Sequence, residues 1–228
     1  CAANDNDLSV CADNWTTRRY SNPNLKPERS RQYTLGMIFE PSRQWTYSID
    51  YWNIKRTDLI SEIGDDIILG NLAKYGNLVH RTEDGDIDYI ELRKENRGAQ
   101  VATGLDLAVE MHGIKTAYGK FTARMLGTLM LDSKLQTNPG DKYVSNLGKF
   151  VTDGVVQRWR HRLNLGWEYG DVALNLGNTY YSAYDDQNSA INIDDGSIVA
   201  ANKVKAYSLW DISAAYTPSK ALTLRAGI

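Results

Sequence analysis

The chain has 228 residues, and its formal net charge of -2 at pH 7 is almost balanced. Because the chain lacks a strongly basic field, a nucleic-acid partner is excluded. The sequence also has no acidic tract of the kind that would indicate a calcium-buffering role. The aromatic content is uneven, with 14 Tyr and 6 Trp against 3 Phe. Tyr and Trp favour positions where an apolar environment meets water.

The uninterrupted apolar stretches are short, as at Ile67-Ile68-Leu69. A bilayer-spanning helix needs about 20 mostly apolar residues, so a membrane protein with this sequence would have to be a β-barrel. No signal peptide opens the sequence, although an outer-membrane protein needs one for export, and we therefore expect a fragment.

Cys1 and Cys11 are the two cysteines, and they lie in a polar stretch rich in Asn and Asp. This spacing predicts a disulfide-closed loop in an oxidising compartment. Two free thiols are the alternative, and the start Cys1-Ala2-Ala3 also resembles the mature end of a lipid-anchored protein.

Alternation of apolar and polar residues predicts a strand over 32–40 and another over 45–54, joined by a turn at 41–44. The same hairpin pattern recurs three times. The further predicted strands are 101–111, 121–131, 159–167, 172–181, 207–216 and 222–228. Long polar connections lie at 61–98, 133–157 and 182–206.

Eight strands with short turns on one side and long loops on the other are unusual for a compact soluble domain. They are typical of an outer-membrane barrel, whose periplasmic turns are short and extracellular loops long. The positions of the aromatic residues also predict two girdles, one at each membrane–water interface. The residues next to the short turns are Phe39, Trp45, Phe121, Trp167 and Tyr216, and those next to the long loops are Tyr33, Tyr51, Trp159, Tyr180, Tyr181 and Tyr207.

One polar segment carries a family signature. Asn22-Pro23-Asn24-Leu25-Lys26-Pro27-Glu28-Arg29-Ser30, followed by Tyr33-Thr34-Leu35-Gly36, resembles the "N-P-x-L-K-P-E-x-S…Y-x-L-G" motif of TonB-dependent receptors. The segments 51–60, 103–107 and 207–211 are similar to later strands of that family. The matching signature residues are Asn22, Pro23, Leu25, Lys26, Pro27, Glu28 and Ser30.

The resemblance implies one partial barrel domain over residues 1–228, with about eight strands of an antiparallel twenty-two-stranded transmembrane barrel and without the plug domain and final strand. It implies a place in the Gram-negative outer membrane, in contact with its lipid. The implied function is active import of a scarce nutrient such as a ferric siderophore, haem or cobalamin. Its energy would come from the TonB-ExbB-ExbD complex through a TonB box in the absent N-terminal region.

Proline explains part of the signature without reference to any family. Pro23 and Pro27 keep the preceding residues out of the helical conformation and remove two backbone donors. The segment is therefore expected to run extended as a structural rim element, the alternative being direct ligand contact.

An enzyme is not expected. His80, His112 and His161 show no metal-binding spacing, and no nucleophile elbow, P-loop or zinc-protease motif is present. The acidic stretch 83–88 lacks the EF-hand pattern and is expected to be a solvated loop rather than a calcium site. We expect no cofactor and no metal. A passive porin or a surface-adhesion barrel remains the alternative function.

Period-two geometry also predicts a polar wall inside the barrel. Counting back from the turn near 114–118 places Arg124 opposite Ala108, and so diagonal to Asp106 and Glu110. If the apolar face meets lipid, these charges face the lumen together with Arg160 and Arg162. The two arginines are expected to contact the plug, with an anionic ligand as the alternative.

Overall fold

The computed structural model describes residues 15–151, 154–186 and 202–228, so the predicted Cys1–Cys11 pair lies outside the described residues. The chain divides into two compact units. The first contains the residues up to Arg29 and Thr57–Gly98, and the second contains Ser30–Arg56 and Ala99–Ile228.

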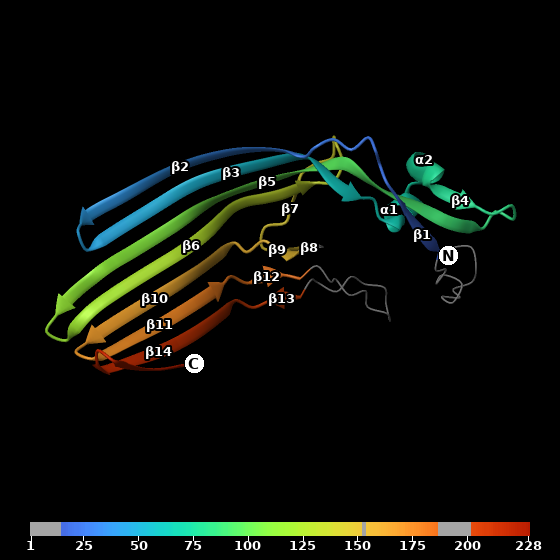
Figure 1. The fold of residues 1–228 in the computed structure, drawn as a ribbon. Coiled ribbons are helices and arrows are strands. Elements are labelled where there is room, and N and C mark those ends of the chain that lie inside the picture. The colour runs from blue at the N-terminus through green and yellow to red at the C-terminus, as the bar shows by residue number, and fades with distance from the viewer. Residues whose placement is uncertain (1–14, 152–153, 187–201) are drawn as a thin grey trace. The chain divides into compact units, whose positions relative to one another are not determined.

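An antiparallel sheet of eight long strands forms the second unit, with β3 and β5 also contributing to the first (Figure 1). The order across the sheet is β2-β3-β5-β6-β10-β11-β14-β15, so sequential strands are neighbours. Their bounds are β2 (Arg29–Ser42), β3 (Trp45–Glu62), β5 (Ile87–Thr116), β6 (Gly119–Gln136), β10 (Trp159–Tyr169), β11 (Val172–Tyr181), β14 (Tyr207–Ser219) and β15 (Leu222–Gly227). All eight strands predicted from the alternation are confirmed.

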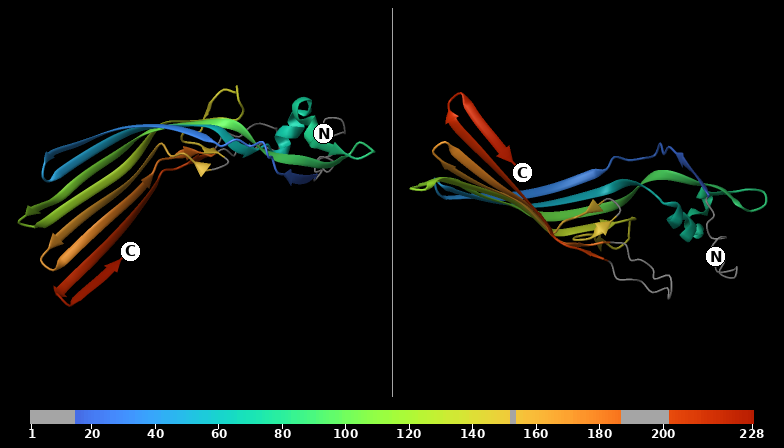
Figure 2. Two further views of the ribbon diagram at one scale, coloured as in Figure 1. Left: turned by 45° about the horizontal axis from the view of Figure 1, so that its top comes forward. Right: turned by 90° about the horizontal axis from the view of Figure 1, so that it is seen from below.

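The four short turns lie together at one end of this sheet, as Figure 1 and both views of Figure 2 show. They are two-residue turns at 43–44, 117–118, 170–171 and 220–221. The first two fall inside the turns predicted at 41–44 and near 114–118, and the other two join the strands of the third and fourth predicted hairpins. The one-sided arrangement of short turns is therefore confirmed.

Strand alternation gives the sheet two different faces. On the apolar face, Trp167 lies opposite Phe121 on one side and Leu174 on the other. Apolar side chains of this unit remain accessible; Leu35 of β2, for example, is 76% exposed. Among the described residues, the buried apolar side chains outside the first unit are limited to Ala99. The apolar face thus needs a further apolar environment to cover it.

The long connections contain more regular structure than the sequence predicts. β6 continues to Gln136, and short strands follow in the second and third connections. These are β7 (Val144–Ser145), β8 (Phe150–Val151), β9 (Gly154–Val155), β12 (Tyr184–Asp185) and β13 (Lys203–Val204).

The first connection, predicted as a polar loop over 61–98, belongs to a folded unit. Its elements are β1 (Thr16–Tyr20), α1 (Asp65–Gly70), α2 (Leu72–Tyr75), the 3-10 helix η1 (Gly76–Leu78), β4 (Val79–Arg81) and the first part of β5. Ile63, Ile68, Ile90 and Leu92 are each at most 4% exposed and form its core. These four residues are separated by polar stretches in the sequence, which is why they do not produce a visible period. Within the described part of the chain, no helix is long and apolar enough to cross a bilayer.

Candidate functional site

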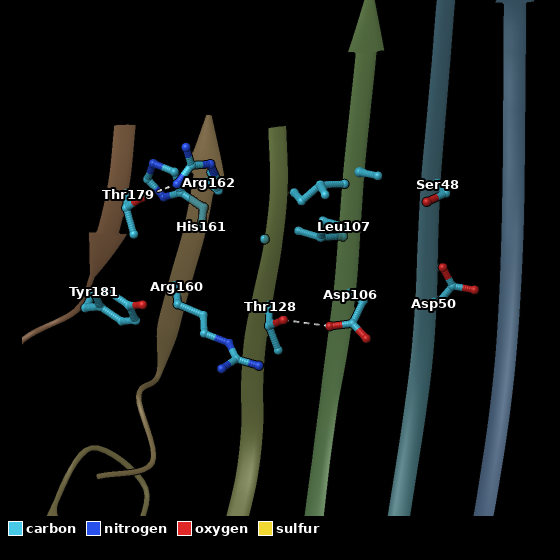
Figure 3. Close-up of a pocket in the computed structure, with 13 residues that line it drawn as sticks. Ser48, Asp50, Asp106, Leu107, Thr128, Arg160, His161, Arg162, Thr179 and Tyr181 are labelled. Atoms are coloured by element: carbon cyan, nitrogen blue, oxygen red, sulfur yellow. Dashed lines mark hydrogen bonds between the residues drawn. The ribbon is translucent and has the colours of Figure 1, made fainter. Parts of the chain in front are cut away.

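The polar face of the second unit is the candidate site. Side chains from five neighbouring strands surround a depression of about 680 Å³ on the sheet (Figure 3). Its polar lining residues are Ser48 and Asp50 from β3, Asp106 from β5, Thr128 from β6, Arg160 and Arg162 from β10, and Thr179 and Tyr181 from β11. They are brought together by register, because Arg160 lies opposite Thr128 on one side and Tyr181 on the other.

Arg124 lies directly opposite Glu110 and forms an ion pair with it at 3.0 Å. The predicted pairing of Arg124 with Ala108 is wrong, since Ala108 lies opposite Leu126. Two features explain the difference. The turn sits nearer to β6 than the sequence indicated, and the register shifts between Met111 and Ile114.

This register shift decides which side chains share a face. Two residues of β5, between Met111 and Ile114, oppose the single residue between Phe121 and Ala123 on β6, which is a β-bulge. A slip of one residue moves side chains to the other face of a strand. The bulge therefore sets Glu110 rather than Met111 opposite Arg124.

Arg162 is the second paired arginine, and its Nη2 atom lies 3.7 Å from Oδ2 of Asp211 on β14. It also donates a hydrogen bond to Oγ1 of Thr179 at 3.2 Å. Asp211 was missed as a site residue in the sequence, although it belongs to the segment that resembles a late family strand. Its contact with Arg162 spans the intervening strand β11, which strand alternation alone does not reveal.

Charges are unevenly distributed across the depression. Asp50 and Asp106 lie on the β3 and β5 side, and Arg160 and Arg162 lie on the β10 side (Figure 3). Asp106 accepts a hydrogen bond from Thr128 Oγ1 at 2.8 Å. The ion pairs found among the described residues leave Arg160 without a carboxylate partner.

These charges suit binding to a complementary polar surface rather than bond chemistry. The Arg124 and Glu110 side chains are 58% and 30% exposed, so their pairing contributes little stability in water. No group of three or more His, Cys, Asp or Glu side chains that could hold a metal ion occurs in the described ranges. All five predicted charged residues, Asp106, Glu110, Arg124, Arg160 and Arg162, share the polar face by register.

Two of the predicted girdle residues lie elsewhere. Tyr181 is opposite both Arg160 and Tyr207, which places Tyr181 and Tyr207 on the polar face. Tyr180 lies opposite His161 on the apolar face and stacks on its ring, with ring centroids 5.2 Å apart. Counting aromatic residues near a loop does not reveal the face on which each one lies.

His161 is on the apolar face, as the alternation predicts, and its ring is fully engaged. The indole N–H of Trp159 donates to Nδ1 of His161 at 2.9 Å. An indole nitrogen is only a donor, so Nδ1 accepts and Nε2 carries the proton that faces Oδ1 of Asn178 at 3.2 Å. The side-chain amide of Asn178 then donates to Ser208 Oγ and to the Leu209 carbonyl oxygen. The polar groups of the His161 and Asn178 side chains are thus paired within the sheet.

The signature residues from Asn22 to Glu28 form an anchored segment in the first unit. The side chain of Asn96 on β5 accepts from the Lys26 backbone N–H at 2.7 Å and donates to the Lys26 carbonyl oxygen at 2.7 Å. Asn96 also donates to the Asp58 carbonyl oxygen, and a Glu28 carboxylate oxygen accepts from the Ile60 backbone N–H at 2.9 Å. Asn22 donates to the Lys94 carbonyl oxygen. These contacts support the structural interpretation of the signature.

Asn96→Ala is expected to raise the hydrogen-exchange rate of the Lys26 amide by about tenfold, because the amide loses its side-chain acceptor. Exchange measured by mass spectrometry on the full-length protein tests this. Asn96→Asp is the matched variant, since it keeps an acceptor for the Lys26 N–H and removes the donors. Equal exchange at Lys26 in all three proteins would contradict the assigned role of Asn96.

The family model "TonB dependent receptor-like, beta-barrel" matches residues 4–228. A search of curated proteins finds no match. Among solved structures, the outer membrane transporter YddB from Escherichia coli is similar with a TM-score of 0.62 and 14% identity, over 93% of this chain and 30% of YddB.

Two receptors from other bacteria are also similar. The ferric enterobactin receptor PfeA from Pseudomonas aeruginosa, in complex with enterobactin, has a TM-score of 0.62 and 19% identity over 92% of this chain and 27% of its own. The siderophore receptor PirA from Acinetobacter baumannii has a TM-score of 0.59 and 18% identity over 92% of this chain and 28% of its own. The chain thus spans less than a third of the length of these structures. Because the family model matches nearly the whole chain, the chain belongs to the TonB-dependent receptor β-barrel family, whose members are barrels of the Gram-negative outer membrane and not enzymes.

Proposed function

We propose that the receptor containing this chain imports a scarce metal chelate, a ferric siderophore in the first instance, across the outer membrane with energy delivered by TonB-ExbB-ExbD. The observation that carries the proposal is the match of residues 4–228 to the receptor barrel family. The similar structures include the ferric enterobactin receptor PfeA and the siderophore receptor PirA, which supports this cargo class. Haem and cobalamin are the other cargoes to be compared.

In this proposal the apolar face of the sheet contacts lipid and the polar face forms part of the lumen wall. The exposed apolar row on β2, where Leu35 is 76% and Met37 64% exposed, fits a surface that meets hydrocarbon. Asp106, Glu110, Arg124, Arg160 and Arg162 would then point toward the plug. Their contacts with it are polar and accessible to water, so they suit a surface that must release during transport.

Of the charged residues on the polar face, Arg160 is the one best placed to bind a group from outside this chain. It borders the depression and has no carboxylate partner among the described residues (Figure 3). A guanidinium can hold a carboxylate through two parallel hydrogen bonds. We therefore propose that Arg160 pairs with an acidic side chain of the plug rather than with the cargo.

Uptake of iron-labelled enterobactin tests the function. Cells lacking their own enterobactin receptors are given the full-length receptor, in strains with and without TonB. We expect accumulation only in the strain with TonB, because passage past a plug requires energy. Equal accumulation in both strains would indicate a passive porin, and surface binding without accumulation would indicate an adhesion barrel.

We also propose that Cys1 and Cys11 form a disulfide in the segment that precedes Asn22. Closing a loop of about eleven residues would stabilise its ordered form by roughly 2–3 kcal/mol in the chain-entropy model. Mass spectrometry of the unreduced protein after alkylation is the measurement, and two alkylated thiols would refute the pairing.

A further inference from the structure

The strands of the first unit form a sheet with an outer face, whose side chains do not pack into the hydrophobic core. β1 and β4 both pair with the first part of β5 (Figure 1). Register places Ile90 and Leu92 on the inner face, with Val79 opposite Ile90. The other face carries the residues that we name the cation–aromatic patch, which are Arg18 and Tyr20 from β1, His80 from β4, and Tyr89, Glu91 and Arg93 from β5.

Three side chains of the patch surround Tyr89, which are Arg18, His80 and Tyr20. The Arg18 guanidinium carbon lies 4.0 Å from the centroid of the Tyr89 ring. The His80 ring stacks on Tyr89 with centroids 4.2 Å apart and planes 12° apart. The Tyr20 ring lies 6.5 Å from that of Tyr89, and Arg93 lies over Tyr20 at 5.9 Å. The flat groups are thus held in place before any ligand arrives.

Of the charged side chains in the patch, Arg18 remains available to bind an anion. Glu91 has a side chain only 10% exposed, pairs with Arg93, and faces His80 Nε2 at 3.4 Å. Among the described residues, no carboxylate forms an ion pair with Arg18. A guanidinium stacked on a ring keeps its N–H edge free for an acceptor. The pKa of Tyr89 is raised, chiefly by its hydrogen bond with Tyr20, so this phenol stays neutral and does not repel an anion.

We propose that the cation–aromatic patch binds a small aromatic oxyanion, meaning a planar ring that carries a carboxylate or a phenolate. The ring stacks on the exposed aromatic side chains, of which Tyr20 is 42% exposed, and the oxyanion accepts hydrogen bonds from Arg18. The inference rests on the proposed function, because it assigns a class of chemical group on the cargo. It places a recognition site on the first unit in addition to the polar face of the second.

Salicylate is the probe, and its binding is measured by calorimetry on the purified full receptor in detergent, without TonB. Salicylamide, which lacks the carboxylate charge, and cyclohexanecarboxylate, which lacks the aromatic ring, are the matched ligands. We expect salicylate to bind at least about fivefold more tightly than either, since both the charge and the ring contribute. Equal binding of salicylate and cyclohexanecarboxylate would overturn the proposal, and so would the absence of salicylate binding.

Variants locate the site. Arg18→Gln is expected to weaken salicylate binding by about tenfold, because it removes the charged donor. Arg19→Gln is the matched control: Arg19 is the next residue on β1, lies opposite Leu92 on the other face, and pairs with Glu62 at 3.1 Å. Equal weakening by both variants would overturn the assignment. This binding is independent of TonB, so uptake that does not need TonB would refute the proposed function and leave the patch assignment standing.

Discussion

Leu107→Arg is expected to lower the free energy of unfolding of the receptor in lipid vesicles by about 2–4 kcal/mol, because it would place a charge on the lipid side near the bilayer midplane. Leu107 lies opposite Gly127, which in turn lies opposite His161 on the apolar face. Urea unfolding of the full receptor, followed by tryptophan fluorescence, gives the free energy.

Leu126→Arg is the matched control, because it makes the same substitution on the neighbouring strand and the other face. Leu126 lies opposite Ala108 and Arg162 and is 42% exposed. An arginine there adds a charge to a polar surface and is expected to cost less than about 1 kcal/mol. A larger loss for Leu126→Arg than for Leu107→Arg would show that the lipid and lumen faces are assigned in reverse.

Local alternation was sufficient to predict the strands, because each one keeps a period of two over about ten residues. In β10, for example, Leu163, Leu165 and Trp167 alternate with Asn164 and Glu168. A one-residue bulge within a strand is not visible in such a pattern. The β5–β6 turn was also placed too early in the sequence, and the predicted partner of Arg124 was therefore wrong by two positions, although its face was correct.

The folded first unit could not be predicted by the same means. Its core combines Ile63, which follows β3, and Ile68 of α1 with Ile90 and Leu92 of β5. These contacts join residues more than twenty positions apart, and short helices do not generate a long apolar period. The signature was more informative, since Pro23 and Pro27 predicted an extended segment. The sequence did not reveal Asn96 as its anchor, because a single asparagine carries no pattern.

The same limit applies to the candidate site. Asp106, Arg160 and Arg162 were identified because they alternate with apolar neighbours within single strands. Asp211 was not assigned, because its relation to Arg162 depends on the order of three strands. Long-range register is set by turns and bulges, so it becomes visible only when the strands are paired.

Gly119→Ala is expected to lower the free energy of unfolding by about 2–4 kcal/mol. Gly119 follows the turn between β5 and β6 and has a φ of +120°, a conformation that L side chains rarely adopt. A Cβ atom there would lie 2.5 Å from the Glu168 carbonyl oxygen and 2.8 Å from Trp167 Nε1. The carbonyl is part of strand β10 and cannot move aside without disturbing the ladder, so steric overlap adds to the backbone strain.

Gly170→Ala separates these two contributions. Gly170 lies in the next short turn and has a φ of +56°, but no atom lies within 4 Å of the position of its Cβ. Only the left-handed backbone is then penalised, by about 1 kcal/mol. Urea unfolding of both variants in lipid vesicles gives the comparison. Since Trp167 Nε1 donates to the Tyr118 carbonyl oxygen at 2.8 Å, Gly119→Ala should also alter the Trp167 environment, whereas Gly170→Ala should not. Equal losses of stability in the two variants would show that the β5–β6 turn does not pack against β10 in the membrane.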